Sequence, residues 1–192
     1  MVKNILLVGV GGQGTILISK ILSAGLAQMG YDVKMSEIHG MSQRGGSVTT
    51  QIKYGEKVYA PNLGIAEADI IISFEKSETI RALPNLKKGG TIITDDREIH
   101  SVPVLTGACA YPHDAIDQLK EVVPSLVVVK AAEVAEKLGN IKAQNIVLLG
   151  ALVKSMALEA VDWKALIAKM VPAKAVELNL AAFEAGYAMY WG

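Results

Sequence analysis

The sequence has few residues that carry redox, metal or covalent chemistry. Cys109 is the only cysteine. It excludes an internal disulfide, and also an iron–sulfur cluster held by this chain alone, because such a cluster needs about four thiolates. The three histidines, His39, His100 and His113, are scattered without zinc-ligand spacing. No G-x-S-x-G elbow and no G-D-G segment typical of a thiamine diphosphate site is present. This inventory favours a ligand-binding or assembly subunit over a complete enzyme.

An excess of charge of either sign is also lacking. The 19 basic residues offset the 19 acidic ones, which argues against nucleic acid or an anionic membrane as a partner. The early uncharged run at 4–19 is broken by glycines and polar residues, so no transmembrane helix is predicted. Strand-like residues begin at once, without the pattern of a signal peptide. We therefore expect a cytoplasmic protein that binds neither nucleic acid nor membrane.

Aromatic residues make up only 5% of the chain, whereas hydrophobic residues make up 51% and the mean hydropathy is +0.33. The core is therefore predicted to be aliphatic. A chain of this size can bury most of its apolar surface by itself. The apolar excess indicates a further surface that is buried against a partner, as in an obligate subunit.

Short aliphatic runs alternate with helical patterns along the first 140 residues, which is typical of a parallel sheet covered by helices. The predicted strands are 3–9, 32–38, 68–75, 89–96 and 125–131, and the predicted helices are 13–29, 78–86, 114–123 and 132–138. Alternation and a Gly-Glu turn predict an antiparallel hairpin within 47–61. The segment 101–112 is ambiguous and is expected to be partly extended.

Only helices are predicted after residue 143, at 144–160, 163–170 and 173–189. We expect an α/β fold that is Rossmann-like: a mostly parallel open sheet with an antiparallel hairpin, helices on both faces and a C-terminal helical segment. The chain 1–192 is expected to be a single domain, with the sheet core in 1–142 and the helical segment in 143–192. Gly150 is expected to allow close helix packing. Asn145 either caps its helix or bonds a backbone group across the sheet edge.

The segment "GVGGQG" places a glycine loop between a predicted strand and a predicted helix. Gly9, Gly11 and Gly14 match G-x-G-x-x-G, which permits a tight turn, a close backbone approach and close helix–strand packing. The helix N-terminus that follows favours an anion. Gly12 makes the loop more open, and Gln13 is expected to place an amide at its mouth. The loop either holds an anionic group or only permits tight packing.

Two nucleotide-binding classes can be weighed from this loop. A nucleoside triphosphatase phosphate loop does not fit, because Thr15 stands where a lysine is needed. A nicotinamide dinucleotide would require an acid at the end of the second strand, and Glu37 lies 23 residues after Gly14. A free-standing NAD- or NADP-binding protein is therefore an alternative hypothesis.

The polar segment "HGMSQRGG" at 39–46 follows the second predicted strand. The carboxyl ends of parallel strands meet at one edge of a sheet, so this loop is expected to face the glycine loop. Arg44, followed by Gly45 and Gly46, is suited to a carboxylate or phosphate. Gln43 adds an amide, and His39 adds an imidazole, a group that can change charge near neutral pH. The alternative is a solvated loop with a surface arginine.

Acidic residues follow the next two strands. The Glu75 carboxylate is a candidate to accept hydrogen bonds from a ribose-like group. The alternative is that Ser77 and Glu78 merely begin the next helix. The acids of 95–98 are interpreted as a solvated loop, because they lie too close together in sequence to be assigned as an acid–base pair.

Four segments, "GVGGQG", "EIHGMSQRGGSV", "ADIIISFE" and "NIVLLGAL", resemble the γ subunit of 2-oxoacid:ferredoxin oxidoreductases. The wording "HGMSQRGGSV" is most similar to the small subunit of the indolepyruvate enzymes. By matching position, the resemblance carries over 11–14 as the glycine loop. It carries over His39, Gln43, Arg44, Gly45 and Gly46 as the loop that faces a partner or ligand. No catalytic residue is carried over.

The resemblance implies a subunit of a complex that decarboxylates a 2-oxoacid oxidatively, forms an acyl-coenzyme A and reduces ferredoxin. Thiamine diphosphate and iron–sulfur clusters would belong to partner subunits. This chain is implied to help bind coenzyme A or the substrate, and the phosphates of coenzyme A suit a helix N-terminus and an arginine. The isolated chain would be inactive, and a homodimer is a further expectation.

Overall fold

The computed structural model describes residues 1–39 and 45–189, and His39 only through its backbone. Six strands form one sheet in the order β2-β3-β1-β4-β5-β6. They are β1 Lys3–Val10, β2 Asp32–His39, β3 Ser47–Gly55, β4 Ala68–Ser73, β5 Leu86–Asp95 and β6 Leu126–Val129. β4 pairs parallel with β1 and β5, and β6 pairs parallel with β5, whereas β3 lies antiparallel between β2 and β1.

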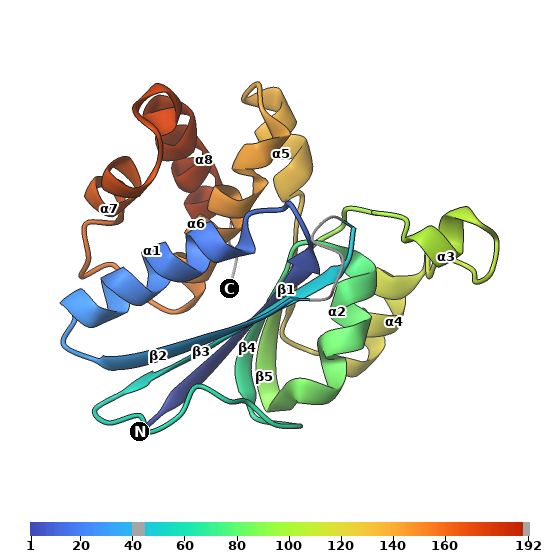
Figure 1. The fold of residues 1–192 in the computed structure, drawn as a ribbon, viewed down its shortest axis with the longest axis horizontal. Coiled ribbons are helices and arrows are strands. Elements are labelled where there is room, and N and C mark those ends of the chain that lie inside the picture. The colour runs from blue at the N-terminus through green and yellow to red at the C-terminus, as the bar shows by residue number, and fades with distance from the viewer. Residues whose placement is uncertain (40–44, 190–192) are drawn as a thin grey trace.

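Helices cover both faces of this sheet (Figure 1). α1 Thr15–Gln28, α5 Ala131–Lys137, α6 Gln144–Ser155, α7 Trp163–Met170 and α8 Val176–Met189 lie on one face, and α2 Lys76–Ala82 and α4 Ala115–Val122 lie on the other. The short α3, Val102–Leu105, sits in a segment that projects from the body (Figure 1). Among the described residues, no helix is long and apolar enough to cross a membrane.

Side chains alternate between the two faces of the sheet along each strand and so contribute to two hydrophobic clusters, one on each face. In β1, Ile5 and Leu7 join the cluster beneath α1 and α6, and Leu6 and Val8 join the cluster beneath α2 and α4. This follows because successive strand side chains point to opposite faces.

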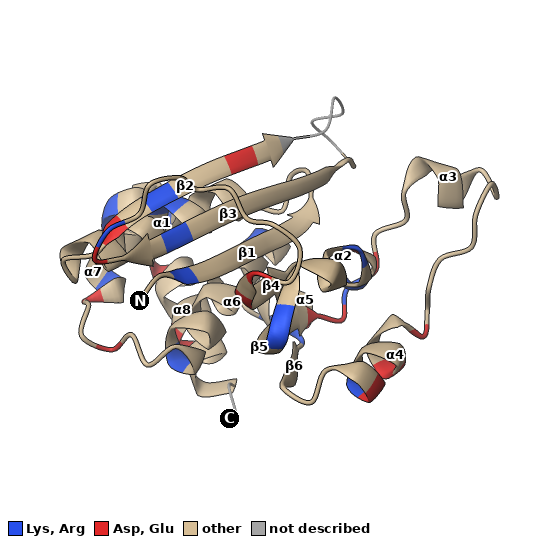
Figure 2. Cartoon of the chain, turned by 90° about the horizontal axis from the view of Figure 1, so that it is seen from below, with Lys and Arg blue, Asp and Glu red and all other residues tan. Residues whose placement is uncertain are grey.

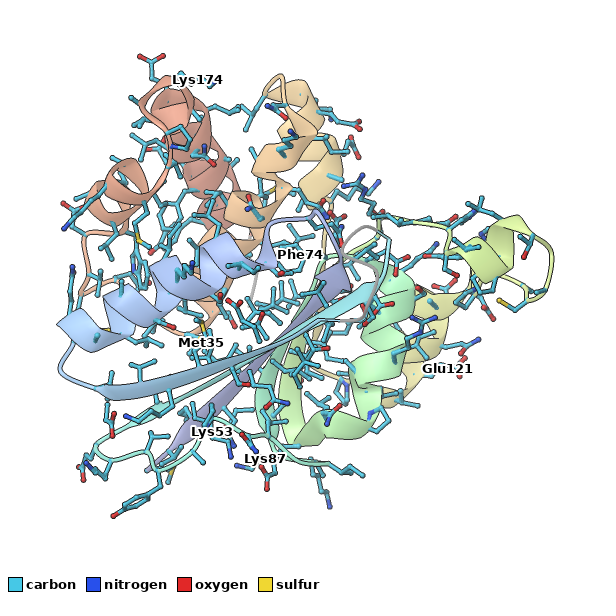
Figure 3. All side chains as sticks on the ribbon, viewed as in Figure 1. Met35, Lys53, Phe74, Lys87, Glu121 and Lys174 are labelled. Carbon is cyan, nitrogen blue, oxygen red and sulfur yellow. The ribbon has the colours of Figure 1, made fainter. Side chains whose placement is uncertain are left out.

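In Figure 3, Met35 lies between β2 and α1, and Lys53 and Lys87 lie at the edge of the sheet away from Phe74.

The α/β fold, the antiparallel element and the C-terminal helices are confirmed, but the position of the hairpin was wrong. β3 pairs antiparallel with β2, which precedes it in the chain, as well as with β1, so the hairpin consists of β2 and β3 and not of two strands around the Gly-Glu pair near residue 55. Residues 56–67 form no strand. Figure 2 shows the face of β2 and β3 that lies away from α1.

The C-terminal helices pack through two glycines, as expected for Gly150. A Cβ on Gly150 would lie 2.2 Å from the Phe183 carbonyl oxygen, and one on Gly186 would lie 1.8 Å from the Val147 carbonyl oxygen. Backbone therefore touches backbone where α6 crosses α8. No larger side chain fits at either position without moving a helix.

Candidate functional site

The glycine loop joins the carboxyl end of β1 to the N-terminus of α1. Gly14 is the N-cap of α1, with φ +80°, and a Cβ there would meet the Asn145 amide nitrogen at 2.3 Å. Both observations require glycine at this position. Asn145 Nδ2 donates to the Gly14 carbonyl at 3.2 Å. Of the two roles predicted for Asn145, bonding backbone across the sheet edge is therefore confirmed.

Gln13 lines the groove beside the loop, and both polar atoms of its amide bond to backbone groups of the protein. Its Oε1 accepts from the Val10 N–H at 2.7 Å, and its Nε2 donates to the Phe74 carbonyl at 2.8 Å. The Gln13 side chain thus connects the carboxyl end of β1 to the residue that follows β4. The same packing leaves no room at Gly9, where a Cβ would lie 2.9 Å from Gln13 Oε1 and 3.0 Å from Phe74 Cβ.

The two predicted loops meet at one edge of the sheet. The Gly11 N–H donates to the Gly46 carbonyl at 2.8 Å, and the next residue, Ser47, donates from its hydroxyl to Glu78 at 2.5 Å. Gly45 is exposed, with φ +77°. Gln43 and Arg44 lie outside the described residues, as does the side chain of His39.

Glu37 does not take the place of a ribose-binding acid, and that prediction was wrong. Dinucleotide recognition needs the acid-bearing strand directly beside the strand of the glycine loop. Here β3 lies between them, with Glu37 opposite Thr50 and Thr50 opposite Leu7. Two strand spacings separate Glu37 from β1 by about 9.6 Å.

Glu75 was also assigned wrongly to a ligand. It is fully buried and is the N-cap of α2, accepting from the Glu78 N–H at 3.0 Å and the Ser77 hydroxyl at 2.6 Å. Its other oxygen accepts from the Ile99 N–H at 3.2 Å and from the Tyr111 hydroxyl. With four donors inside the protein, Glu75 fastens the segment that leads to and from α3.

The side-chain amide of Gln144 also lies at this edge of the sheet, and the sequence analysis did not identify it. Gln144 begins α6 and is 1% exposed. Its Nε2 donates to the Phe74 carbonyl and to Asp95 Oδ2, at 2.8 and 2.7 Å, and its Oε1 accepts from Arg97 at 2.7 Å. Gln13 Nε2 lies 3.4 Å from the same Oε1. The glycine loop and the end of β5 therefore share one hydrogen-bonded network.

Asp95 is fully buried, which corrects its interpretation as part of a solvated loop. Its Oδ2 also accepts from the Ala132 N–H at 2.7 Å and so holds the start of α5. Burial, with a further contribution from the nearby Asp96 carboxylate, raises the pKa of Asp95 to about 7. The signal available in the sequence was the position of Asp95 at the end of a buried strand.

A groove of about 270 Å³ opens beside the glycine loop. Its walls come from the glycine loop, from the start of α6 and from the start of α8, and its lining residues include Gly12, Gly14, Leu17, Lys142, Pro172 and Leu178. Within the described ranges, the backbone N–H groups of Gly12, Gly14 and Thr15 have no acceptor. Such N–H groups at a helix N-terminus favour a negatively charged group.

A Rossmann-like α/β fold with a glycine loop after its first strand is what the resemblance to γ-type oxidoreductase subunits implied, and the comparisons with known proteins agree on the family and the fold. Residues 4–189 match the family described as "Pyruvate ferredoxin/flavodoxin oxidoreductase". The chain therefore belongs to this family, and the resemblance inferred from the motifs is confirmed.

Relatives that match this chain over nearly their whole length are named as subunits of oxidoreductases or synthases. The chain is 38% identical over 190 residues to indolepyruvate oxidoreductase subunit IorB of Thermococcus kodakarensis, covering 95% of this chain and 93% of that protein. It is 28% identical over 191 residues to 2-oxoglutarate synthase subunit KorC of Methanothermobacter marburgensis, with 97% and 95% covered. The chain is thus a subunit of a 2-oxoacid:ferredoxin oxidoreductase rather than a free NAD-binding protein.

Solved structures share the fold. The γ subunit of a keto/oxoacid ferredoxin oxidoreductase from Geobacter sulfurreducens matches with a TM-score of 0.71 at 22% identity, with 97% of each chain covered. A 2-oxoglutarate:ferredoxin oxidoreductase from Magnetococcus marinus matches with a TM-score of 0.71 at 19% identity. This match covers 98% of the present chain and 31% of that chain, so the same fold also occurs as part of a longer polypeptide.

Proposed function

We propose that the complex containing this chain oxidatively decarboxylates an aryl 2-oxoacid of the indolepyruvate type to an acyl-coenzyme A and reduces ferredoxin. The observation that carries this proposal is the 38% identity to an indolepyruvate oxidoreductase subunit over nearly the whole chain. Subunits named for 2-oxoglutarate are more distant, at 28% identity or less. We further propose that residues 1–192 act as one γ-type domain in the cytoplasm.

Thiamine diphosphate and iron–sulfur clusters belong, in this proposal, to the partner subunits. The single cysteine, Cys109, is exposed and cannot ligate a cluster without other thiolates. Among the described residues, no group of three histidine, cysteine or acidic side chains is arranged to hold a metal ion. The chain therefore contributes binding and assembly surfaces, and in isolation it is inactive and free to form a homodimer through the surface that its partners cover.

The glycine-loop groove is the proposed contact with coenzyme A. Free N–H groups at the start of α1 suit a phosphate, and the exposed Lys142 adds positive charge to the groove wall. The apolar side chains Leu17, Pro172 and Leu178 suit the uncharged part of such a ligand. The loop 39–46, which ends against Gly11, is proposed to face the thiamine-binding partner.

The reaction is tested by purifying the complex through a tag on this chain from native extract. Ferredoxin reduction is then measured with indolepyruvate, phenylpyruvate, pyruvate and 2-oxoglutarate, each with and without coenzyme A. We expect activity that depends on coenzyme A and is highest with the aryl substrates. Full activity of the partner subunits without this chain, or a preference for 2-oxoglutarate, would contradict the proposal.

The contact with coenzyme A is tested by Gly12→Asp with Gly12→Asn as its matched control. Gly12 is exposed, and a Cβ there meets no atom of the described residues within 4 Å, so both variants share the same backbone cost from φ +100° and differ only in charge. A carboxylate at the helix N-terminus should repel a phosphate. We expect Gly12→Asp to raise the KM for coenzyme A about tenfold relative to Gly12→Asn. Equal KM values would assign the loop to packing or assembly alone.

A further inference from the structure

Arg97 is an arginine that forms no ion pair with any carboxylate in the part of the chain that the structure describes. It lies two residues after the end of β5, at the edge of the sheet that carries the glycine loop. The other arginine in the described ranges, Arg81, forms an ion pair with Glu78 at 2.7 Å. Arg97 instead donates to the neutral side-chain oxygen of Gln144, also at 2.7 Å, and no ion pair joins it to a carboxylate of the described residues. Its full positive charge therefore remains available.

The guanidinium is held in place from inside the protein. Gln144 is almost fully buried and is itself fixed through its amide nitrogen by the Phe74 carbonyl and by Asp95. The Arg97 carbonyl in turn accepts from the Lys76 N–H at 3.1 Å, which fixes its backbone. A half-buried arginine with one nitrogen anchored keeps its remaining N–H groups in a defined direction, which lowers the entropy lost on binding.

The acidic neighbours of Arg97 in sequence all lie in the described part of the chain, and none of them forms an ion pair with it. Glu98 pairs with Lys76 and lies 3.1 Å from His113 Nδ1. Asp95 is buried and accepts from Ala132 and Gln144. Asp96, also in the described part of the chain, is exposed and forms no ion pair with Arg97. An uncompensated, pre-oriented guanidinium of this kind recognises a planar or tetrahedral oxyanion by paired hydrogen bonds.

We propose that Arg97, oriented by Gln144, binds an oxyanion of a small co-substrate at the glycine-loop edge of the sheet. The inference rests on the proposed function, because it assumes a complex that uses coenzyme A and a 2-oxoacid. Both molecules carry oxyanions: phosphates in coenzyme A and a carboxylate in the 2-oxoacid. Arg97 is a binding residue in this proposal and takes no part in proton or electron transfer.

The test uses the assembled complex with Arg97→Gln, Arg97→Lys and the matched control Arg81→Gln. Loss of the guanidinium should raise one KM about tenfold or more while kcat changes little, and lysine should restore part of the loss. Arg81→Gln should leave both KM values unchanged, because this exposed arginine lies on α2 and is already paired. Size-exclusion chromatography establishes that each variant remains assembled.

The two KM values, measured separately for coenzyme A and for the 2-oxoacid, identify which molecule carries the oxyanion that Arg97 binds. An increase in the KM for coenzyme A assigns a phosphate. If that increase disappears with 3′-dephospho-coenzyme A as the probe, the phosphate is the 3′ one, and if it persists, it belongs to the pyrophosphate. An increase confined to the KM for the 2-oxoacid assigns its carboxylate.

Two outcomes overturn the inference. Unchanged KM values in an assembled Arg97→Gln complex would make Arg97 a solvated surface residue, while the proposed function would stand. Failure of the variant complex to assemble, with the isolated chain still folded by circular dichroism, would make Arg97 a subunit contact. Absence of any 2-oxoacid oxidation in the unmodified complex would instead reject the proposed function itself.

Discussion

The backbone N–H of Gly11 donates a 2.8 Å hydrogen bond to the carbonyl oxygen of Gly46. This bond joins the loop after β1 to the loop that precedes β3, although 35 residues separate the two positions. Because β3 returns antiparallel beside β1, with Ser47 opposite Val10, the two bends are brought to the same edge of the sheet. The candidate site therefore depends on strand pairing as much as on the glycine motif.

Gln13 should hold this edge together. Replacement by glutamate keeps the shape of the side chain but places a carboxylate oxygen against the Phe74 carbonyl in place of a donor. We expect Gln13→Glu to lower the free energy of unfolding by about 2 kcal/mol or more at pH 7, measured by urea denaturation. Gln28→Glu on the exposed end of α1 is the control and should stay within about 0.5 kcal/mol. If the two variants were equally stable, the hydrogen bonds of the Gln13 side chain would contribute little to stability.

The contact between α6 and α8 allows no added methyl group at Gly186. Gly186→Ala places a Cβ where the Val147 carbonyl oxygen already lies, and backbone atoms cannot rotate away. We expect a loss of about 2–3 kcal/mol in the free energy of unfolding. Gly64→Ala is the control, since its Cβ would make only an ordinary contact with Glu67 at 3.4 Å. A loss of the same size at both positions would contradict the packing argument.

The attachment of the projecting segment 96–113 to the rest of the protein depends on the buried carboxylate of Glu75. Tyr111→Phe removes a hydroxyl donor from a carboxylate that has no access to water. We expect a loss of about 2 kcal/mol in the free energy of unfolding and faster amide exchange in 96–113 than in the rest of the chain. Tyr59→Phe, at a position 89% exposed, should change neither quantity. Unchanged exchange in 96–113 would mean that other contacts fasten the segment.

Much of this architecture could be predicted from sequence because it follows from local patterns. Alternating aliphatic runs and helical stripes indicated the parallel strands and their helices, and the rule that parallel strands end at one edge brought two loops together. Gly150 was correctly interpreted because a glycine inside an apolar helix marks a point where a second backbone can approach closely. The start of α2 was less exact, since Glu75 acts as the cap where Ser77 or Glu78 was expected.

The errors arose where a residue's role depends on a distant partner. Nothing local in 47–55 reveals that this strand inserts between β1 and β2, and that insertion removes Glu37 from the glycine loop. Asp95 was interpreted as solvated because acids are usually exposed. Its burial depends on Gln144, which is 49 residues away in the chain. Arg97 was overlooked for the same reason, because its anchor is that same amide.

The buried Asp95 should make stability depend on pH in a definite direction. Its carboxyl ionises near the ordinary pKa of 3.8 when the chain is unfolded, whereas burial raises the pKa in the folded protein to about 7. Between these values the folded state keeps a proton that the unfolded state has lost. The contribution of Asp95 to stability therefore falls as the pH rises from about 4 to about 7, and it stays low above that range.

Asp95→Asn isolates this effect, because an amide keeps an acceptor for the Ala132 N–H and cannot ionise. The free energy of unfolding, measured by urea denaturation at steps from about pH 4.5 to 8, should fall for the unmodified chain by as much as about 3 kcal/mol more than for the variant. Asp117→Asn, on the exposed face of α4, should follow the unmodified chain throughout. If the unmodified chain and Asp95→Asn gave parallel curves, Asp95 would be ionised in the folded protein across this range, and its hydrogen bonds from Ala132 and Gln144 would have to outweigh the cost of burying the charge.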